Sequence, residues 1–352
     1  MPTILNDVRP VGFLQNLKGD ARSPESFAFP ACLTSLMEFL GEDPRWETIT
    51  AHNREWSKRR LNDAILAATG MGFGLLWHKD NCPSCHDLMQ VNDHDETIEL
   101  AFGYVGYEYE IIKKTDGNYG KLKRRIVESI DAGRPVLAFG AIGPPECSII
   151  CGYDLGGDTL LGWSHFQSYD KKICAPNGMF RIINWHRNLT KIVLCGVKKE
   201  PVTDLKEIAR RGLAVANAKQ LSGYYAGAAA YDAWVGYVTD PAYKKMKKKV
   251  LKQKYGLHHG IVGNHAEARC YLGGFLREAA GDDARLHSIA EIYGEIHDTC
   301  WKVWEVAGGL HKKTAWKIFR NRFVQAKIAE ILREIQALDE KAARELQAWL
   351  GE

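Results

Sequence analysis

The sequence predicts an α+β domain followed by an all-α domain. Residues 1–200 mix helical patterns with short apolar runs and frequent turn signals. After the segment GVKKEPVTD nearly every stretch fits a helix, and no stretch reads convincingly as a strand. A chain of 352 residues is long enough for two domains, each with its own core. We therefore expect domains at 1–200 and 201–352.

The first domain is expected to open with helices. In SPESFAFPACLTSLMEFLGED, Pro30 lies at a helix entrance, apolar residues recur at helical spacing and Gly41 ends the helix. A second amphipathic helix, WSKRRLNDAILAATG, ends at Gly70, and a loop follows over 71–95. Segment 96–114 (ETIELAFGYVGYEYEIIKK) predicts a helix or a strand, then an interruption at glycine, then a strand.

The sheet of this domain follows a further helix over 120–133. Strands are expected in 134–142, in a hairpin within 144–167, in 180–188 and in 190–199. The last is a continuous apolar run, typical of a central strand. Because these strands follow one another with short turns, we expect an antiparallel sheet.

The second domain is expected to be a helical bundle or helical cap. Its first helix begins at the segment TDLKEIARRG, where Thr203 can cap and Glu207 falls in the first turn. The last helix carries one apolar stripe, which would serve either the core or a dimer seam, so a homo-oligomer is among the expected partners. The stripe consists of Ile328, Ile331, Leu332, Ile335 and Leu338.

Composition indicates no nucleic-acid and no membrane partner. The net charge is only +4, and the runs KKMKKK (244–249) and KLKRR (121–125) read as solvated helix faces, although the first could touch an anionic membrane surface. No apolar run approaches the roughly 20 residues of a membrane span, and the N-terminus does not resemble a signal peptide. The nine cysteines do not form a disulfide pattern, which favours a cytoplasmic protein with reduced thiols.

The order of elements over residues 12–200 resembles a known family. The stretches FAFPACLTSLMEFLGED, GMGFGLLW and GRPVLAFGAIGPPECSIICGYDLGGDTLLGW are similar to the N-terminal domain of butirosin biosynthesis protein H. That domain is related to bacteriocin-processing cysteine peptidases and hence to papain. The resemblance implies a papain-like cysteine-hydrolase domain, with Cys32 in the nucleophile position near a helix start, where the helix dipole stabilises a thiolate.

The resemblance also exposes an altered triad. Counting back from Gly152-Tyr153-Asp154, Glu146 falls where the family has its catalytic histidine, and Trp163-Ser164 replaces the orienting residue. His165 is a candidate replacement, but whether it faces the site depends on strand register. The candidate catalytic residues are therefore Cys32, Glu146 and His165.

Two functions follow. The first is amide or thioester hydrolysis or acyl transfer through Cys32, with an acyl-carrier thioester as donor; the second is a catalytically degenerate fold that binds a small cationic molecule or peptide amine through Glu146. No cofactor is expected. The residues expected to line the substrate site are Phe73, Trp77, Cys147, Tyr153, Asp154 and Trp163.

Two further clusters have alternative interpretations. His78, Cys82, Cys85 and His86 could bind Zn²⁺ or haem or form a redox pair, although free thiols in a loop are the simpler interpretation. In the second domain, Arg269 and Arg277 share a helix face and could bind an acidic group or pair with Glu267 or Glu278.

Overall fold

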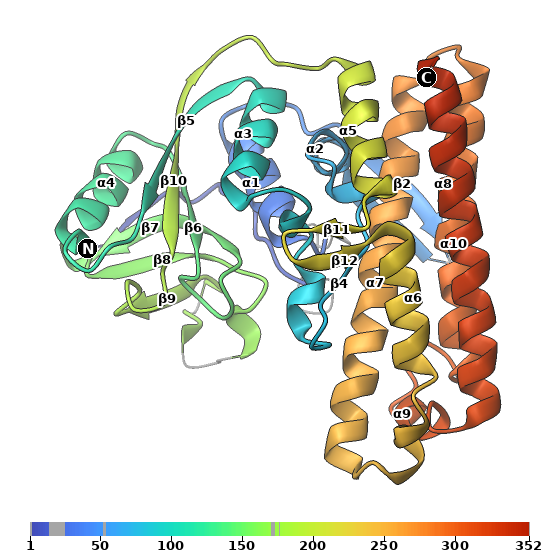
Figure 1. Cartoon of the computed structure of the whole chain (residues 1–352). Coiled ribbons are helices and arrows are strands. Elements are labelled where there is room, and N and C mark those ends of the chain that lie inside the picture. Colours follow the sequence, from blue (N-terminus) through green and yellow to red (C-terminus); the bar gives the residue numbers. More distant parts are fainter. Residues whose placement is uncertain (1, 14–24, 52–53, 170–172, 176, 352) are drawn as a thin grey trace. The chain divides into compact units, whose positions relative to one another are not determined.

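The chain folds as a mixed α+β protein with an antiparallel sheet and a helical C-terminal region (Figure 1). The computed structural model describes residues 2–13, 25–51, 54–169, 173–175 and 177–351. The chain forms two compact units, and neither is one continuous segment. The first unit contains residues 1–65 and 101–202, and the second contains residues 66–100 and 203–352.

A seven-stranded sheet organises the first unit, with strand order β5-β10-β6-β7-β8-β9 and β1 paired to β7. Every pairing in it is antiparallel, and short turns join β6 to β7 and β7 to β8. The strands are β1 (Thr3–Ile4), β5 (Tyr107–Lys113), β6 (Val136–Phe139), β7 (Cys147–Asp154), β8 (Thr159–Trp163), β9 (Phe180–Ile183) and β10 (Lys191–Lys198). A separate hairpin joins β2 (Trp46–Ala51) to β3 (Arg54–Arg59).

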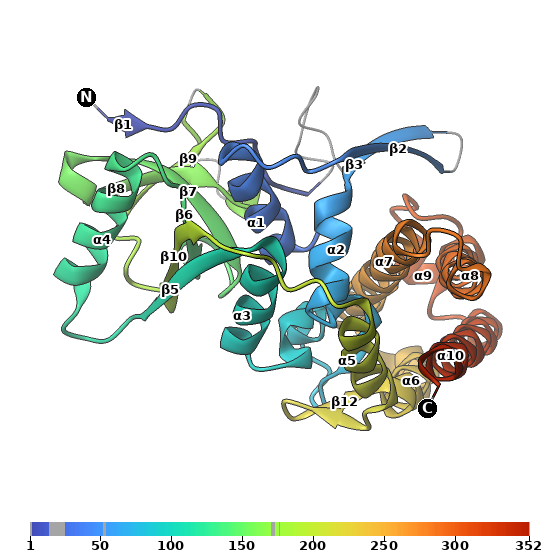
Figure 2. The ribbon, with the colours of Figure 1, turned by 90° about the horizontal axis from the view of Figure 1, so that it is seen from above.

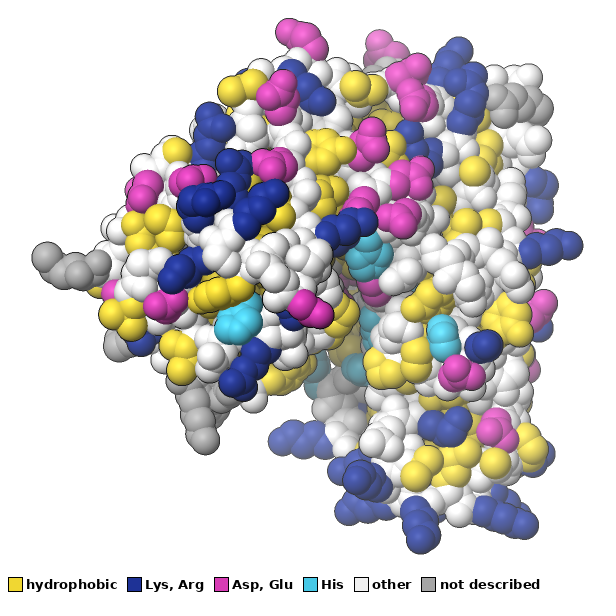
Figure 3. All heavy atoms as spheres, turned by 60° about the vertical axis from the view of Figure 1, so that its left-hand side comes forward, with side chains coloured by type: hydrophobic (Ala, Val, Ile, Leu, Met, Phe, Trp, Pro, Cys, Tyr) yellow, Lys and Arg dark blue, Asp and Glu magenta, His cyan; other side chains and the backbone are white. Residues whose placement is uncertain are grey.

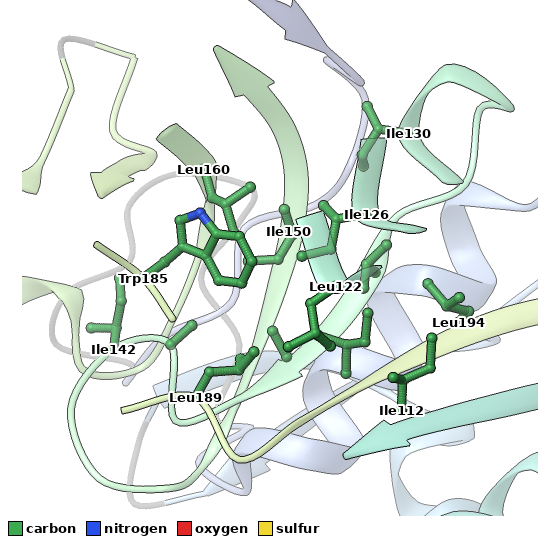
Figure 4. Close-up of a cluster of buried hydrophobic side chains, with 14 of the residues drawn as sticks. Ile112, Leu122, Ile126, Ile130, Ile142, Ile150, Leu160, Trp185, Leu189 and Leu194 are labelled. Carbon is green, nitrogen blue, oxygen red and sulfur yellow. The ribbon is translucent and has the colours of Figure 1, made fainter. Parts of the chain in front are cut away.

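The two faces of this sheet are covered by different helices. Figure 2 shows α1 (Ala28–Phe39) and α4 (Tyr119–Asp131) on opposite sides of β6 and β7. Beneath α4, apolar side chains of the helix and sheet form one cluster, and Ile150 of β7 lies within it (Figure 4). Successive side chains of a strand point to opposite faces of the sheet, so the alternate residues point towards α1. Phe139 of β6 is one of them, and its ring lies 5.9 Å from that of Phe29 in α1 (centroid to centroid).

A β-bulge interrupts the pairing of β7 with β8 between Ile150 and Gly152. Ile150 pairs with Gly162 and Gly152 with Leu161, so Cys151 is the extra residue. The backbones approach so closely here that a Cβ on Gly162 would lie 2.0 Å from the carbonyl oxygen of Ile149. Glycine is therefore required at this point of β8.

The second unit is built around three long helices, α7 (Lys248–Ala279), α8 (Ala284–Val306) and α10 (Arg322–Leu350). Figure 2 shows these helices end-on, side by side. The shorter members are α5 (Leu205–Asn217), α6 (Gly227–Val238), η9 (Pro241–Lys245), α9 (Ala315–Ile318), η3 (Met71–Phe73), η4 (Pro83–His86) and η5 (Leu88–Val91). The predicted apolar stripe of α10 lies in the core, since Ile328, Leu332 and Ile335 are buried.

Several local predictions are corrected. Residues 66–100 pack with the helical unit, whereas the sequence places them with 1–200. The helix expected over 56–70 begins only at Arg60, because the preceding residues extend β3; α2 covers Arg60–Ala68, and α3 covers His94–Val105. Strands also occur after residue 200, since β11 (Gln220–Leu221) and β12 (Tyr224–Ala226) pair with β4 (Leu76–Trp77). The cap of α5 is Asp204, not Thr203, because its carboxylate accepts from the Lys206 amide at 2.9 Å.

Candidate functional site

Cys32 lies in the second turn of α1, with its side chain on the sheet side of the helix. The helix begins at Ala28, and the Ala31 amide already bonds to the Phe27 carbonyl. The free N–H groups of the helix start therefore lie before Cys32, not around it. The side chain is fully buried (0% exposed), and its Sγ donates to the Cys147 carbonyl oxygen at 3.7 Å. This placement differs from the expected position just inside a helix start.

Two further thiols adjoin Cys32 on this face. Cys147 and Cys151 of β7 are buried, and both are free thiols. Burial raises the pKa of Cys147 well above its ordinary value, and its bond with Cys32 and the charge of Glu146 act in the same direction. Burial likewise raises the pKa of Cys151. With these raised pKa values the two thiols stay protonated at neutral pH, so neither supplies Cys32 with a base.

His165 is a buried histidine held by the segment before α1. It follows β8, is 1% exposed, and places Nε2 at 2.8 Å from the Glu25 carbonyl oxygen. Burial lowers its pKa to about 4, so the ring is neutral and Nε2–H donates to that carbonyl. The edge of the Phe13 ring covers it, with centroids 5.2 Å apart. In the described part of the chain, no hydrogen bond joins His165 to Cys32.

Glu146 lies at the entrance to β7, and its side chain is half-buried. Its backbone is fixed by a tight turn, since its amide donates to Pro144 O at 2.6 Å and its carbonyl accepts from Gly140 N at 3.0 Å. Gly140 has φ +78°, and a Cβ there would lie 2.4 Å from the Asn188 carbonyl oxygen. The turn thus holds a carboxylate beside the buried Cys147.

Within the first unit, the residues expected to line a substrate site have different packing partners. Tyr153 packs against the α4 cluster and donates to Asp131 at 2.7 Å, and Asp154 pairs with Arg181 at 2.7 Å. Trp163 pairs with Ile149 across β7 and β8, on the strand that precedes His165.

Phe73 and Trp77 belong to the second unit and serve its core. Phe73 is 2% exposed and meets the Tyr293 ring edge-on at 6.2 Å. Trp77 stacks on Trp234 at 6.0 Å and donates to Asn81 at 2.8 Å. Both side chains are buried against aromatic packing partners and do not line an open surface.

The Cys82–Cys85 loop is held by packing within the second unit. Cys85 Sγ accepts from the His78 amide at 3.0 Å, and Cys82 Sγ lies 2.6 Å from Ser84 Oγ. His86 packs against α7, where Asn264 Nδ2 donates to its carbonyl at 3.2 Å. Burial raises the pKa of Cys85 to about 11. Over the described residues, no group of three His, Cys, Asp or Glu side chains is arranged to hold a metal.

A buried charge cluster in the first unit is absent from the sequence analysis. Arg59, 2% exposed, binds the Glu25 carboxylate, Ser35 Oγ at 2.8 Å and Glu38 Oε2 at 3.1 Å. It therefore ties the segment before α1 to the helix that carries Cys32.

Beside Arg59, the Lys58 side chain is 2% exposed and binds the Asp63 carboxylate. Burial raises the pKa of Asp63 to about 7 against the opposing charge of Lys58. The signal in the sequence is the run of cations Lys58, Arg59 and Arg60 directly before the apolar pattern of α2.

A second buried network lies in the helical unit. Arg269 binds Asp339 through Nε and Nη2 at 2.7 and 2.8 Å, and Asp339 also accepts from Tyr231. The same guanidinium donates to the carbonyl oxygens of Gly72 and, at 3.1 Å, Phe73. The acidic partner of Arg269 is thus Asp339, and the arginine fixes the GMGFG turn.

Comparison with known proteins adds no relative. No protein-family model matches the chain, and no curated protein sequence matches it. Over the described residues, the structure contains no helix with the length and apolar character needed to cross a membrane.

Proposed function

We propose that this chain is a catalytically silent relative of the papain-like cysteine hydrolases, whose hairpin carboxylate, Glu146, binds a small cationic molecule or a peptide amine. The observation that carries the proposal is the complete burial of Cys32 beneath the sheet, with its Sγ bonded to a backbone carbonyl. A nucleophilic cysteine must reach substrate as a thiolate, and a general base must lie within hydrogen-bond reach.

Neither candidate base meets that requirement. His165 uses Nε2–H on Glu25 O, so Nδ1 is its basic atom; Nδ1 is buried and has no hydrogen-bond partner among the described residues, Cys32 Sγ included, and the pKa of about 4 makes the ring a weak base. An ionised Glu146 raises the pKa of neighbouring thiols, as it does for Cys147, and so opposes thiolate formation. The same negative charge attracts a cation, and the rigid turn around Glu146 holds it in a fixed position.

Alkylation tests whether the nucleophile is silent. The folded chain would be treated with iodoacetamide across a pH series, and each cysteine would be quantified by peptide mass spectrometry. We expect Cys32 to react no faster than the buried Cys151 and to become reactive only in denaturant. Labelling of Cys32 with an apparent pKa well below the ordinary value of about 8.5 would contradict the proposal and favour acyl transfer through Cys32.

Ligand binding tests the role of Glu146. A panel of polyamines, aminoglycosides and peptide amines would be screened by thermal shift, and hits measured by calorimetry. Glu146→Gln should weaken binding about tenfold or more, because it removes a charge-assisted contact. Glu108→Gln, which removes an exposed carboxylate from β5, is the matched control. Equal affinity of the Glu146 variant and the unchanged chain would exclude this site.

A further inference from the structure

One end of the helical unit collects two basic segments that are far apart in the sequence. The first runs from η9 into the start of α7, and the second from residue 309 through α9 to the start of α10. Arg320 donates to the Met246 carbonyl oxygen at 2.6 Å, and the Tyr243 and Phe319 rings meet edge-on at 5.1 Å. We name residues 240–256 and 309–323 together the basic end.

The basic end carries far more positive charge than the chain as a whole. It contains one acidic residue, Asp240, while the whole chain has a net charge of only +4. Figure 3 shows Lys and Arg side chains gathered at the lower end of the helical unit. All of its cations except Lys254 are exposed. They are Lys244, Lys245, Lys247, Lys248, Lys249, Lys252, Lys254, Lys312, Lys313, Lys317, Arg320 and Arg322.

Apolar side chains are exposed among these cations. Phe323, the second residue of α10, is 87% exposed, and Val250 is 42% exposed. Trp316 is half-buried, and the Nζ atoms of Lys248, Lys252 and Lys317 lie 5.4 to 5.8 Å from its ring. Tryptophan beside lysines, with an exposed aromatic ring nearby, is the composition of a protein surface that meets the headgroup region of a bilayer.

We propose that the basic end attaches the protein to the surface of membranes that contain anionic lipid. The lysines would lie against lipid phosphates and carboxylates, and Phe323 would enter the boundary between headgroups and acyl chains. A nucleic acid could also bind the cations, but its phosphate backbone offers no apolar layer for the exposed side chains of Phe323 and Val250. The membrane surface offers both. This proposal departs from the expectation of no membrane partner, in which the run 244–249 is interpreted by itself as a solvated helix face; residues 309–323 add further cations and an exposed aromatic ring beside it.

Vesicle co-sedimentation tests the proposal. The full chain would be mixed with phosphatidylcholine vesicles with and without phosphatidylserine, at low and high salt. We expect binding only with phosphatidylserine, weakened by salt. Each lysine near an anionic surface is worth about fivefold in affinity, so Lys247, Lys248 and Lys249 changed together to Gln should cost roughly a hundredfold.

Matched variants separate charge from the apolar contact. Lys219, Lys341 and Arg344, all exposed and outside the basic end, would be changed to Gln as a control of equal charge, and binding should persist. Phe323→Ala should weaken binding about tenfold. Because the side chain is exposed, its removal should leave the fold intact, and circular dichroism would verify this. Binding retained by the triple lysine variant would overturn the proposal. So would tighter binding to a DNA duplex at equal salt with no effect of Phe323→Ala, which would assign the surface to nucleic acid.

Discussion

At the scale of single residues, close backbone approach and burial decide the role of each side chain. Gly162 lies opposite the bulge at Cys151, where no side chain fits between β8 and the Ile149 carbonyl. Cys32 occupies the neighbouring face with no exposed surface. The bulge therefore sets the register in which β7 pairs with β8.

Gly162→Ala should destabilise the first unit by about 2–4 kcal/mol, because the new methyl group would overlap the Ile149 carbonyl oxygen at 2.0 Å. The measurement is the free energy of unfolding in urea. Gly103→Ala in α3 is the control, since a Cβ there meets nothing within 4 Å. The control should be stabilised by about 0.5–1 kcal/mol, as expected for an Ala in a helix. Equal stability of the two variants would show that the strands separate easily at the bulge.

At the scale of elements, α7 organises its own unit through two contacts with residues 71–86. Arg269 holds the GMGFG turn by its carbonyl oxygens, and Gly260 lets the His86 ring approach the helix backbone. Glycine in a helix interior costs stability, so its presence here is explained by the close approach.

Gly260→Ala should destabilise the helical unit by about 1–2 kcal/mol, because a Cβ there would lie 2.2 Å from His86 Cε1. His86→Ala should remove most of that penalty when the two changes are combined, and a double-mutant cycle in urea measures the coupling. Gly256→Ala on the same helix, where a Cβ meets nothing, should be neutral or stabilising. An additive cycle would indicate that the ring moves aside freely.

Most helices and strands could be predicted from the sequence, whereas the long-range contacts of their side chains could not. The hairpin of β7 and β8 and the buried stripe of α10 followed from periodicity and turn residues. The direction of His165 depends on register and on the segment containing Glu25, more than a hundred residues away. Charged side chains are normally exposed, so burial of Lys58 and Arg59 does not follow from local pattern. Arg59 is paired with Glu25 and Glu38 of earlier segments, whereas Lys58 binds Asp63 a few residues further along the chain.

At the scale of the whole molecule, the two units contain different sets of buried titratable groups, so their stabilities should depend on pH in different ways. His258 and His265 of the helical unit are buried, and burial lowers the pKa of each to about 3. The first unit holds His165, with a pKa of about 4, but also Asp63, whose pKa is raised to about 7. A lowered histidine pKa gives stability that is present above pH 6.5 and lost on acidification. A raised carboxyl pKa gives stability that is lost as pH rises.

Acidification from about pH 6.5 to pH 5 should therefore destabilise mainly the helical unit. Two histidines there each cost about 2 kcal/mol over this interval, whereas His165 and Asp63 oppose each other in the first unit. Hydrogen exchange read by mass spectrometry, normalised to the unfolded-chain rate at each pH, would follow the units separately. Equal loss of protection in both units would contradict this assignment.

The division of the chain into interleaved units also sets an order of events during synthesis. Residues 66–100 leave the ribosome before residue 203, so their packing partners in the helical unit do not yet exist. At 5–20 residues per second the delay is roughly ten seconds. Throughout it Phe73, Leu75 and Trp77, each at most 5% exposed in the finished fold, lack that cover. The nascent chain thus exposes an apolar segment between the two halves of its first unit, and chaperone demand should persist until α6 and α8, which carry Trp234 and Tyr293, have been synthesised.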